Sequence, residues 1–152
     1  MQVRHATAAD LSALAHLMSE LGYPTSPEQM GVRMQAIRDR SDYATFVAEA
    51  NGVIAGMVGV AVSPSFYRSD LDGAIVALVV SSESRGHGIG ALLVERAEQW
   101  LRESGVGRVT VKPSTHRQNA HRLYARLGYE QTGLRFSKTI DRVSRAPSIA
   151  TD

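Results

Sequence analysis

The sequence predicts a single domain of mixed α/β class, and three observations support this prediction. The chain has 152 residues, which suits one domain with a sizeable core. Its apolar fraction of 43% and charged fraction of 21% are ordinary for a soluble globular protein. Apolar residues at strand spacing alternate along the chain with apolar residues at helix spacing, which predicts a sheet of about six or seven strands flanked by about four helices. We expect residues 1–140 to form this domain and the polar residues 141–152 to form a flexible tail.

The first strand and the first helix are predicted on either side of Thr7. Val3–Ala6 has the pattern of a short strand, and Thr7–Asp10 is typical of a capping box, in which side chains satisfy backbone N–H groups where a helix begins. Apolar residues at helical spacing follow, namely Leu11, Leu14, Leu17, Met18 and Leu21. We expect this helix to end at Gly22, because Pro24 cannot continue it.

A second helix and a hairpin are predicted next. Ser26–Gln29 forms another capping-box pattern, with Pro27 at the first helical position. Thr45–Ala50 and Val53–Val62 have the composition of strands. They are joined by Asn51-Gly52, a strong signal for a two-residue hairpin turn of type I′.

The second half of the chain continues this alternation of strands and helices. Ala74–Val80 is apolar on both faces and is predicted to be a central strand, after a loop over Pro64–Gly73. An amphipathic helix is predicted from Ile89, with Gly105 just past its end. The remaining elements are a strand over Val106–Val111, a helix over Asn119–Leu127 capped by Gly128, and strands over Tyr129–Leu134 and Phe136–Ile140.

A glycine-rich loop, Arg85-Gly86-His87-Gly88-Ile89-Gly90, lies between the central strand and the helix that follows it. Such a loop exposes backbone N–H groups at a helix N-terminus, where the helix dipole favours negative charge, and Arg85 adds a positive charge. The loop therefore predicts a phosphate or pyrophosphate site, with a tight strand-to-helix turn as the alternative. The dinucleotide fingerprint G-x-G-x-x-G and the Walker A sequence Gly-Lys-Ser/Thr are both absent.

A second motif, Asn119 to Tyr129, follows about 30 residues after the loop, which is consistent with one βαβ unit between the two. Arg85-x-x-Gly88-x-Gly90 together with Asn119-x-x-x-x-Tyr124-x-x-x-Gly128-Tyr129 resembles the two signature motifs of the GNAT family of acetyl-CoA-dependent N-acetyltransferases. The resemblance covers roughly Val3 to Ile140. It implies the GNAT fold, an α+β arrangement around a mixed, mostly antiparallel sheet.

The resemblance also implies where acetyl-CoA, the cosubstrate, binds. The glycine loop would hold the pyrophosphate through Arg85, Gly86, His87, Gly88, Ile89 and Gly90. The preceding strand would run beside the pantetheine chain, with backbone groups of Leu78, Val79 and Val80 facing its amides. One of these N–H groups could face the thioester oxygen as it gains negative charge. No metal is expected.

Tyr124 is the candidate catalytic residue, because the family places its proposed general acid at this position. A phenol near the sulfur atom can donate a proton as the thiolate leaves. The alternative is a core tyrosine, since Tyr124 shares an apolar stripe with Leu123 and Leu127. Asn119 matches a residue that often contacts the cofactor, and its alternative role is a helix N-cap.

The general base is left open by the sequence. An amine with a pKa near 10 must lose a proton before it attacks, and many relatives carry a glutamate on the strand before the glycine loop. Here the corresponding stretch, Ile75–Leu78, has no carboxylate. Candidates by chemistry are Glu49, Asp70, Asp72, Glu83, His116 and His121. A chain of water molecules to the solvent is an equal alternative.

The acceptor is predicted to be a small-molecule amine or a protein amino group. Its pocket is expected between the N-terminal helices, the loop Pro64–Gly73 and the open end of the sheet, with Tyr23, Phe66 and Tyr67 as candidate walls. The net charge of +2, with acidic residues interleaved, argues against a nucleic-acid partner. Relatives often form dimers, so a homodimer is a further possibility.

The sequence thus predicts direct acetyl transfer from acetyl-CoA to a primary amine within a ternary complex. The chain has no cysteine and no Gly-x-Ser-x-Gly motif that would carry an acetyl group. The alternatives are a non-catalytic acyl-CoA-binding sensor on the same fold and, less favoured, a nucleotide-binding structural module. No signal-peptide pattern opens the chain and no apolar run approaches the roughly 20 residues of a membrane span, so we expect a cytoplasmic protein.

Overall fold

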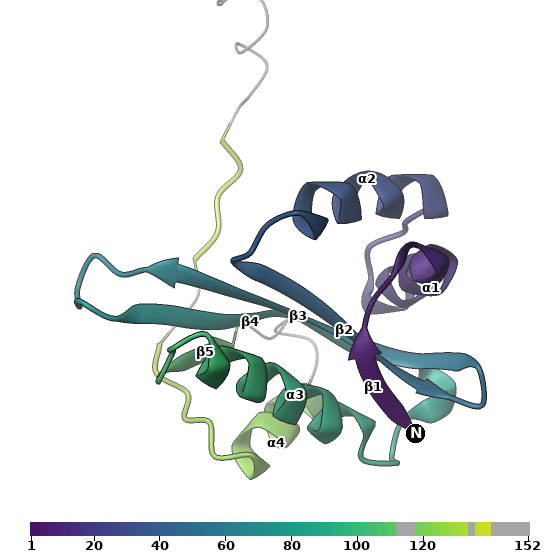
Figure 1. Cartoon of the computed structure of the whole chain (residues 1–152). Coiled ribbons are helices and arrows are strands. Elements are labelled where there is room, and N and C mark those ends of the chain that lie inside the picture. Colours follow the sequence, from purple (N-terminus) through teal and green to yellow (C-terminus); the bar gives the residue numbers. More distant parts are fainter. Residues whose placement is uncertain (112–117, 134–135, 141–152) are drawn as a thin grey trace, which may run out of the picture.

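The computed structural model describes residues 1–111, 118–133 and 136–140, and for residues 118–120 it describes the backbone alone. Within these residues five strands form one sheet in the order β1-β2-β3-β4-β5 (Figure 1). The strands are β1 (Gln2–His5), β2 (Tyr43–Ala50), β3 (Val53–Pro64), β4 (Leu71–Val80) and β5 (Val109–Val111). The first four strands are antiparallel, and β5 runs parallel to β4. The predicted mixed, mostly antiparallel sheet is confirmed.

Four α-helices cover the two faces of the sheet. They are α1 (Leu11–Leu21), α2 (Pro27–Arg38), α3 (Ile89–Glu103) and α4 (Gln118–Arg126). Helices α1 and α2 lie on one face, and α3 and α4 lie on the other (Figure 1). Two short 3₁₀ turns, η1 (Ala8–Asp10) and η2 (Ser82–Ser84), precede α1 and the glycine loop. No helix in the part of the chain that the structure describes is long and apolar enough to cross a membrane.

The local signals in the sequence explain where most elements begin and end. The Ser26 hydroxyl accepts a hydrogen bond from the Gln29 N–H at 3.1 Å, and the Gln29 side chain accepts from the Ser26 N–H at 2.9 Å, so this capping box is confirmed. At Thr7 the box opens η1, which leads directly into α1. Asn51 and Gly52 have φ angles of 53° and 78°, as a type I′ hairpin requires.

Two hydrophobic clusters hold the layers together, one on each face of the sheet. Strand β2 shows how the sequence sorts its side chains between the two faces: Phe46 belongs to the cluster with α3, and Val47 belongs to the cluster with α1. Both side chains are fully buried. The middle strands are therefore apolar on both faces because helices cover both of them.

The C-terminal strands differ from the prediction. Of the expected strand Tyr129–Leu134, the described residues 129–133 are not in the sheet, and neither are residues 136–140; Leu134 lies outside the described residues. Phe136 and Ile140 are 90% and 80% exposed. Alternating apolar residues indicate a preference for extended backbone, but a strand also needs a neighbouring strand to pair with. The expected strand Val106–Val111 is likewise shortened to Val109–Val111. The predicted tail, residues 141–152, lies outside the described residues.

Candidate functional site

Among the described residues, the C-terminal half of β4 has a free edge. β4 pairs with β5 through Gly73 and Val109, through Ala74 and Thr110, and through Ile75 and Val111, and the described ladder ends there. β4 itself continues to Val80 and stays paired with β3 on its other side. Among the described residues, the stretch Val76–Val80 therefore has a neighbouring strand on one side only.

A β-bulge marks the point where this free edge begins. Ile75 pairs with Val60 and Ala77 pairs with Gly59, so Val76 is an extra residue without a partner on β3. Its side chain is 51% exposed, in contrast to its buried neighbour Ile75. Bulges bend a strand and locally disrupt its pairing, so this one bends β4 directly after Ile75, the last of its residues that is paired with β5 in the described part of the chain.

Backbone hydrogen bonds indicate which groups face the free edge. The Ser81 N–H donates to the Ala55 carbonyl of β3 at 2.8 Å. Because residues of an antiparallel strand alternate between its two edges, Val79 faces β3 and Leu78 and Val80 face the free edge. Consistent with this, the Arg85 Nε donates to the Val80 carbonyl at 3.3 Å. Leu78 and Val80 thus offer backbone groups at the edge, whereas Val79 contributes a buried side chain to the core.

The glycine loop leads from this edge into the N-terminus of α3. Gly86 and Gly88 have φ angles of 84° and 78°, a left-handed backbone that other residues rarely adopt, and no atom lies within 4 Å of where a Cβ would stand. α3 begins at Ile89, and none of the described side chains caps it. Its first N–H groups and its positive dipole end are therefore available to an anion.

Glycine is needed at position 90 for a different structural reason than at positions 86 and 88. A Cβ at Gly90 would stand 2.9 Å from Leu123 Cδ2 of α4. This glycine therefore permits close packing of α4 on the first turn of α3. His87 is exposed, and its Nδ1 lies 3.2 Å from the Ser84 carbonyl within the loop.

Tyr124 lies on α4 and is 7% exposed, within the cluster that α3 forms with the sheet. Its ring meets the Tyr129 ring edge-on, at 5.6 Å between centroids. The Tyr129 hydroxyl donates to Glu98 Oε2 of α3 at 2.5 Å, and burial together with this bond raises the pKa of Tyr129. Asn119 is the second residue of α4 rather than the residue that precedes the helix. The roles predicted for Tyr124 and Asn119 remain predictions.

Three of the six candidate bases are engaged with arginines. Glu49 accepts from Arg4 Nε at 2.8 Å. Arg68 pairs with both Asp70 and Asp72, and its hydrogen bond lowers the pKa of Asp70. A carboxylate held in this way is a weaker base than a free one. Glu83 and His121 are exposed on η2 and α4, and His116 lies outside the described residues.

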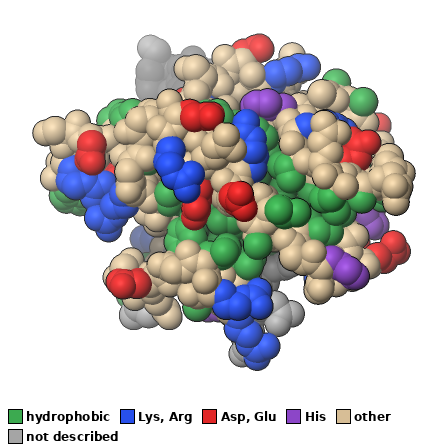
Figure 2. All heavy atoms as spheres, turned by 60° about the horizontal axis from the view of Figure 1, so that its bottom comes forward, with side chains coloured by type: hydrophobic (Ala, Val, Ile, Leu, Met, Phe, Trp, Pro, Cys, Tyr) green, Lys and Arg blue, Asp and Glu red, His purple; other side chains and the backbone are tan. Residues whose placement is uncertain are grey.

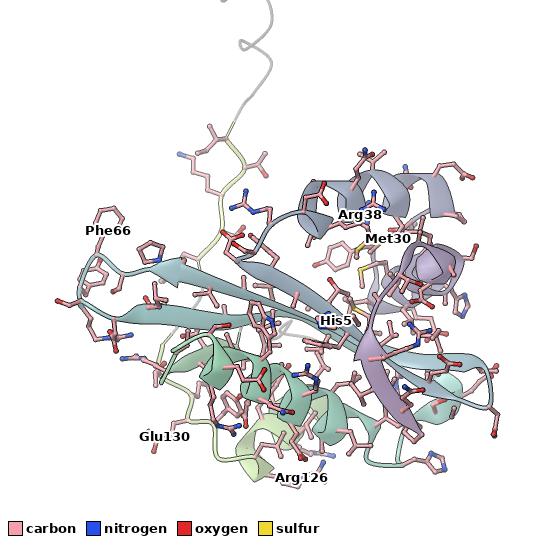
Figure 3. The ribbon with its side chains drawn as sticks, in the orientation of Figure 1. His5, Met30, Arg38, Phe66, Arg126 and Glu130 are labelled. Carbon is pink, nitrogen blue, oxygen red and sulfur yellow. The ribbon has the colours of Figure 1, made fainter. Side chains whose placement is uncertain are left out.

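The three aromatic residues predicted as pocket walls are not brought together. Phe66 and Tyr67 are exposed in the turn between β3 and β4, and Tyr23 is exposed after α1. Figure 3 shows Phe66 at the tip of the long hairpin, away from the helices. Loop position and residue type predicted these walls, but the length of the hairpin places the turn beyond the sheet's covered region.

A hydrogen bond that the sequence did not predict connects α1 with η2, directly before the glycine loop. Glu20 of α1 accepts a hydrogen bond from the Ser82 N–H at 2.9 Å and lies 2.9 Å from His16 Nε2. The bond from Ser82 lowers the pKa of Glu20. The two partners are 62 residues apart, so no local pattern could have signalled the contact.

Charged side chains on the face that carries α3 and α4 are mixed in sign. Figure 2 shows acidic and basic groups interspersed there around exposed hydrophobic side chains. Such a surface does not present the continuous basic patch that nucleic-acid binding uses.

Comparisons with known proteins agree with this geometry. The sequence model of the acetyltransferase (GNAT) family matches residues 11–129. An aminoalkylphosphonate N-acetyltransferase from Salmonella typhimurium is 27% identical, over 91% of this chain and 91% of its own length. The crystal structure of a transcriptional regulator from Bacillus halodurans aligns with a TM-score of 0.81 at 24% identity, over 90% of this chain and 99% of that chain. An aminoglycoside N-acetyltransferase in complex with CoA aligns with a TM-score of 0.81 at 18% identity, over 91% of this chain and 93% of that chain. These solved structures share the fold.

Proposed function

This chain belongs to the acetyltransferase (GNAT) family and is an acyltransferase, and we propose that it transfers an acetyl group from acetyl-CoA directly to a primary amine. The observation that carries this proposal is the edge of β4 that is free among the described residues and leads into the uncapped N-terminus of α3. A ligand that carries amides followed by a pyrophosphate matches these two features in that order. Backbone groups of Leu78 and Val80 would pair with the amides, and the loop from Arg85 to Gly90 would hold the pyrophosphate.

The residues available to the chemistry fit transfer without a covalent enzyme intermediate. The sequence has no cysteine, so no thiol can accept the acetyl group. Acetyl-CoA supplies the activated acetyl group as a thioester. Tyr124, on the helix that packs against the first turn of α3, would donate a proton to the leaving thiolate. The attacking amine would lose its proton to water or to one of the candidate bases.

A non-catalytic acyl-CoA sensor is the second candidate function, and one observation favours it. The stretch Ile75–Leu78 holds no carboxylate, and Glu49, Asp70 and Asp72 are all paired with arginines. A sensor needs the cofactor site but no base. Binding of acetyl-CoA without turnover on any amine would support this alternative.

An amine panel separates the two candidates. Free thiol released from acetyl-CoA would be measured with small amines, amino acids, aminoalkylphosphonates, aminoglycosides and lysine peptides, and the acetylated product would be identified by mass. We expect thiol and N-acetyl product in equal amounts with at least one class. In parallel, intact-mass analysis with acetyl-CoA alone should show no acetylated enzyme. Acetylation of a catalytic side chain would contradict direct transfer.

A further inference from the structure

A cavity of about 330 Å³ lies beside β2, toward the edge of the sheet that is opposite to the β5 edge. It is bounded by α2 and by the point where β1 ends at His5, and Figure 3 labels both His5 and Arg38 of its lining. Its size is that of a site for a small organic molecule. Its lining includes the apolar side chains of Met34 and Trp100 and no Asp or Glu.

We propose that this cavity binds an acidic group at the far end of the acceptor amine, an inference that rests on the proposed acetyl transfer. The acceptor class is then an amino acid whose carboxylate is separated from its amine by an extended apolar chain.

The charge of the cavity supports an anionic occupant. Arg38, at the last turn of α2, lines the cavity, and its guanidinium takes part in none of the ion pairs or side-chain hydrogen bonds found among the described residues. The neighbouring Arg40 is instead neutralised by Asp42, at 2.9 and 2.8 Å. An arginine without a carboxylate partner beside a cavity that lacks acidic groups favours a carboxylate ligand.

The register of the sheet connects the cavity wall with the bulge on β4. Thr45 lines the cavity. Its neighbours Ala44 and Phe46 belong to the hydrophobic cluster with α3, so the Thr45 side chain lies on the opposite face of the sheet, which carries α1 and α2. Thr45 pairs with Gly59. A Cβ at Gly59 would stand 3.5 Å from Val76 Cγ2, so Val76 lies on this same face.

This row of residues sets a length for the acceptor. Thr45, Gly59 and Val76 lie on three successive strands, and two strand spacings amount to about 10 Å. Gly59 contributes no side chain to the middle of the row, and Val76 is half exposed at the start of the free edge. With the thioester near Val76, an amine attacking there would have its acidic group about 10 Å away, at the Thr45 wall of the cavity that Arg38 also lines.

Trp100 allows occupancy of the cavity to be measured without any turnover. It is the single tryptophan of the chain and it lines the cavity. Aminooctanoate and octylamine would be titrated separately while the tryptophan fluorescence is followed, in the presence of CoA. We expect aminooctanoate to change the fluorescence and to bind at least about tenfold more tightly than octylamine, which lacks the carboxylate.

Two arginine variants on α2 localise the effect. Arg38→Gln should abolish the preference for aminooctanoate over octylamine. Arg33→Gln removes the same charge from an exposed position of α2 outside the cavity, where Arg33 bonds to Thr25 Oγ1 at 3.0 Å, and should keep the preference. In acetylation assays, KM should fall from β-alanine through aminohexanoate to aminooctanoate.

The outcomes separate this inference from the proposed function. Equal binding of aminooctanoate and octylamine, or a preference that survives in Arg38→Gln, overturns the acidic-group site even if amines are acetylated. A carboxylate preference that depends on Arg38 supports the site even if no amine is acetylated, and in that case the proposed acetyl transfer is what fails.

Discussion

Replacing Gly88 by alanine should damage acetyl-CoA binding beyond its effect on stability, and Gly105 offers a matched control. The two glycines flank opposite ends of α3, with φ angles of 78° and 84°, and at neither position does an atom lie within 4 Å of where a Cβ would stand. Alanine at either position therefore adds backbone strain without a steric clash. A left-handed backbone costs a residue with a Cβ about 1–2 kcal/mol. Each variant should lose about 2–8 °C in Tm at this chain length.

The addition of acetyl-CoA distinguishes the two variants, because Gly88 lies in the loop proposed to hold the pyrophosphate and Gly105 lies at the other end of α3. Saturating acetyl-CoA at about 100 times its Kd stabilises the native protein by about 2.7 kcal/mol. If alanine at position 88 distorts the loop enough to weaken binding tenfold, about 1.4 kcal/mol of that stabilisation is lost. The rise in Tm on adding acetyl-CoA should then be smaller by about 3–6 °C in Gly88→Ala and unchanged in Gly105→Ala.

Thermal unfolding with and without acetyl-CoA measures both quantities in one experiment. The difference between the two ligand-induced shifts is the decisive number, because the strain common to both variants cancels. Equal ligand-induced shifts in Gly88→Ala and Gly105→Ala would refute the assignment of the loop as the pyrophosphate site.

Three further predictions concern the helices and the N-terminal strand. Tyr124→Phe should reduce turnover by about 10²–10⁴-fold while acetyl-CoA binding, measured by calorimetry, stays nearly intact; equal losses in both would indicate a packing role instead. Tyr129→Phe removes the hydrogen bond to Glu98 and should lower the free energy of unfolding in urea by about 1.5–3 kcal/mol, and no change would show that the bond contributes nothing. The hydrogen bond from Arg4 lowers the pKa of Asp10 in the folded protein, so its carboxylate stabilises the fold above the unfolded pKa of about 3.9 and this stabilisation is lost as pH falls through the lower folded value. Asp10→Asn should therefore cost more stability at neutral pH than in acid, and a cost independent of pH would contradict that linkage.

The parts of the fold that the sequence predicts well are those fixed by local hydrogen bonds. The capping box at Ser26 and the turn at Asn51-Gly52 involve groups only a few residues apart, so residue type at each position largely decides the geometry. The glycine loop belongs to the same group, since its left-handed residues follow directly from Gly86 and Gly88.

The parts that the sequence could not predict depend on contacts between distant segments. The bond between Glu20 and Ser82 and the contact of Gly90 with Leu123 arise only when helices pack. The same limit applies to the C-terminal residues. Their apolar alternation suggested strands, but Tyr129 instead turns back at the end of α4, where its N–H donates to the Tyr124 carbonyl at 2.9 Å.

Hydrogen–deuterium exchange with and without acetyl-CoA tests the central claim most directly. The claim is that the cosubstrate lies along the free edge of β4 and against the N-terminus of α3. Acetyl-CoA should slow exchange at the amides of Leu78 and Val80 and across residues 86–91, while the amide of Val79, which faces β3, changes little. Protection confined to other parts of the chain, with these amides unaffected at saturating acetyl-CoA, would contradict the account.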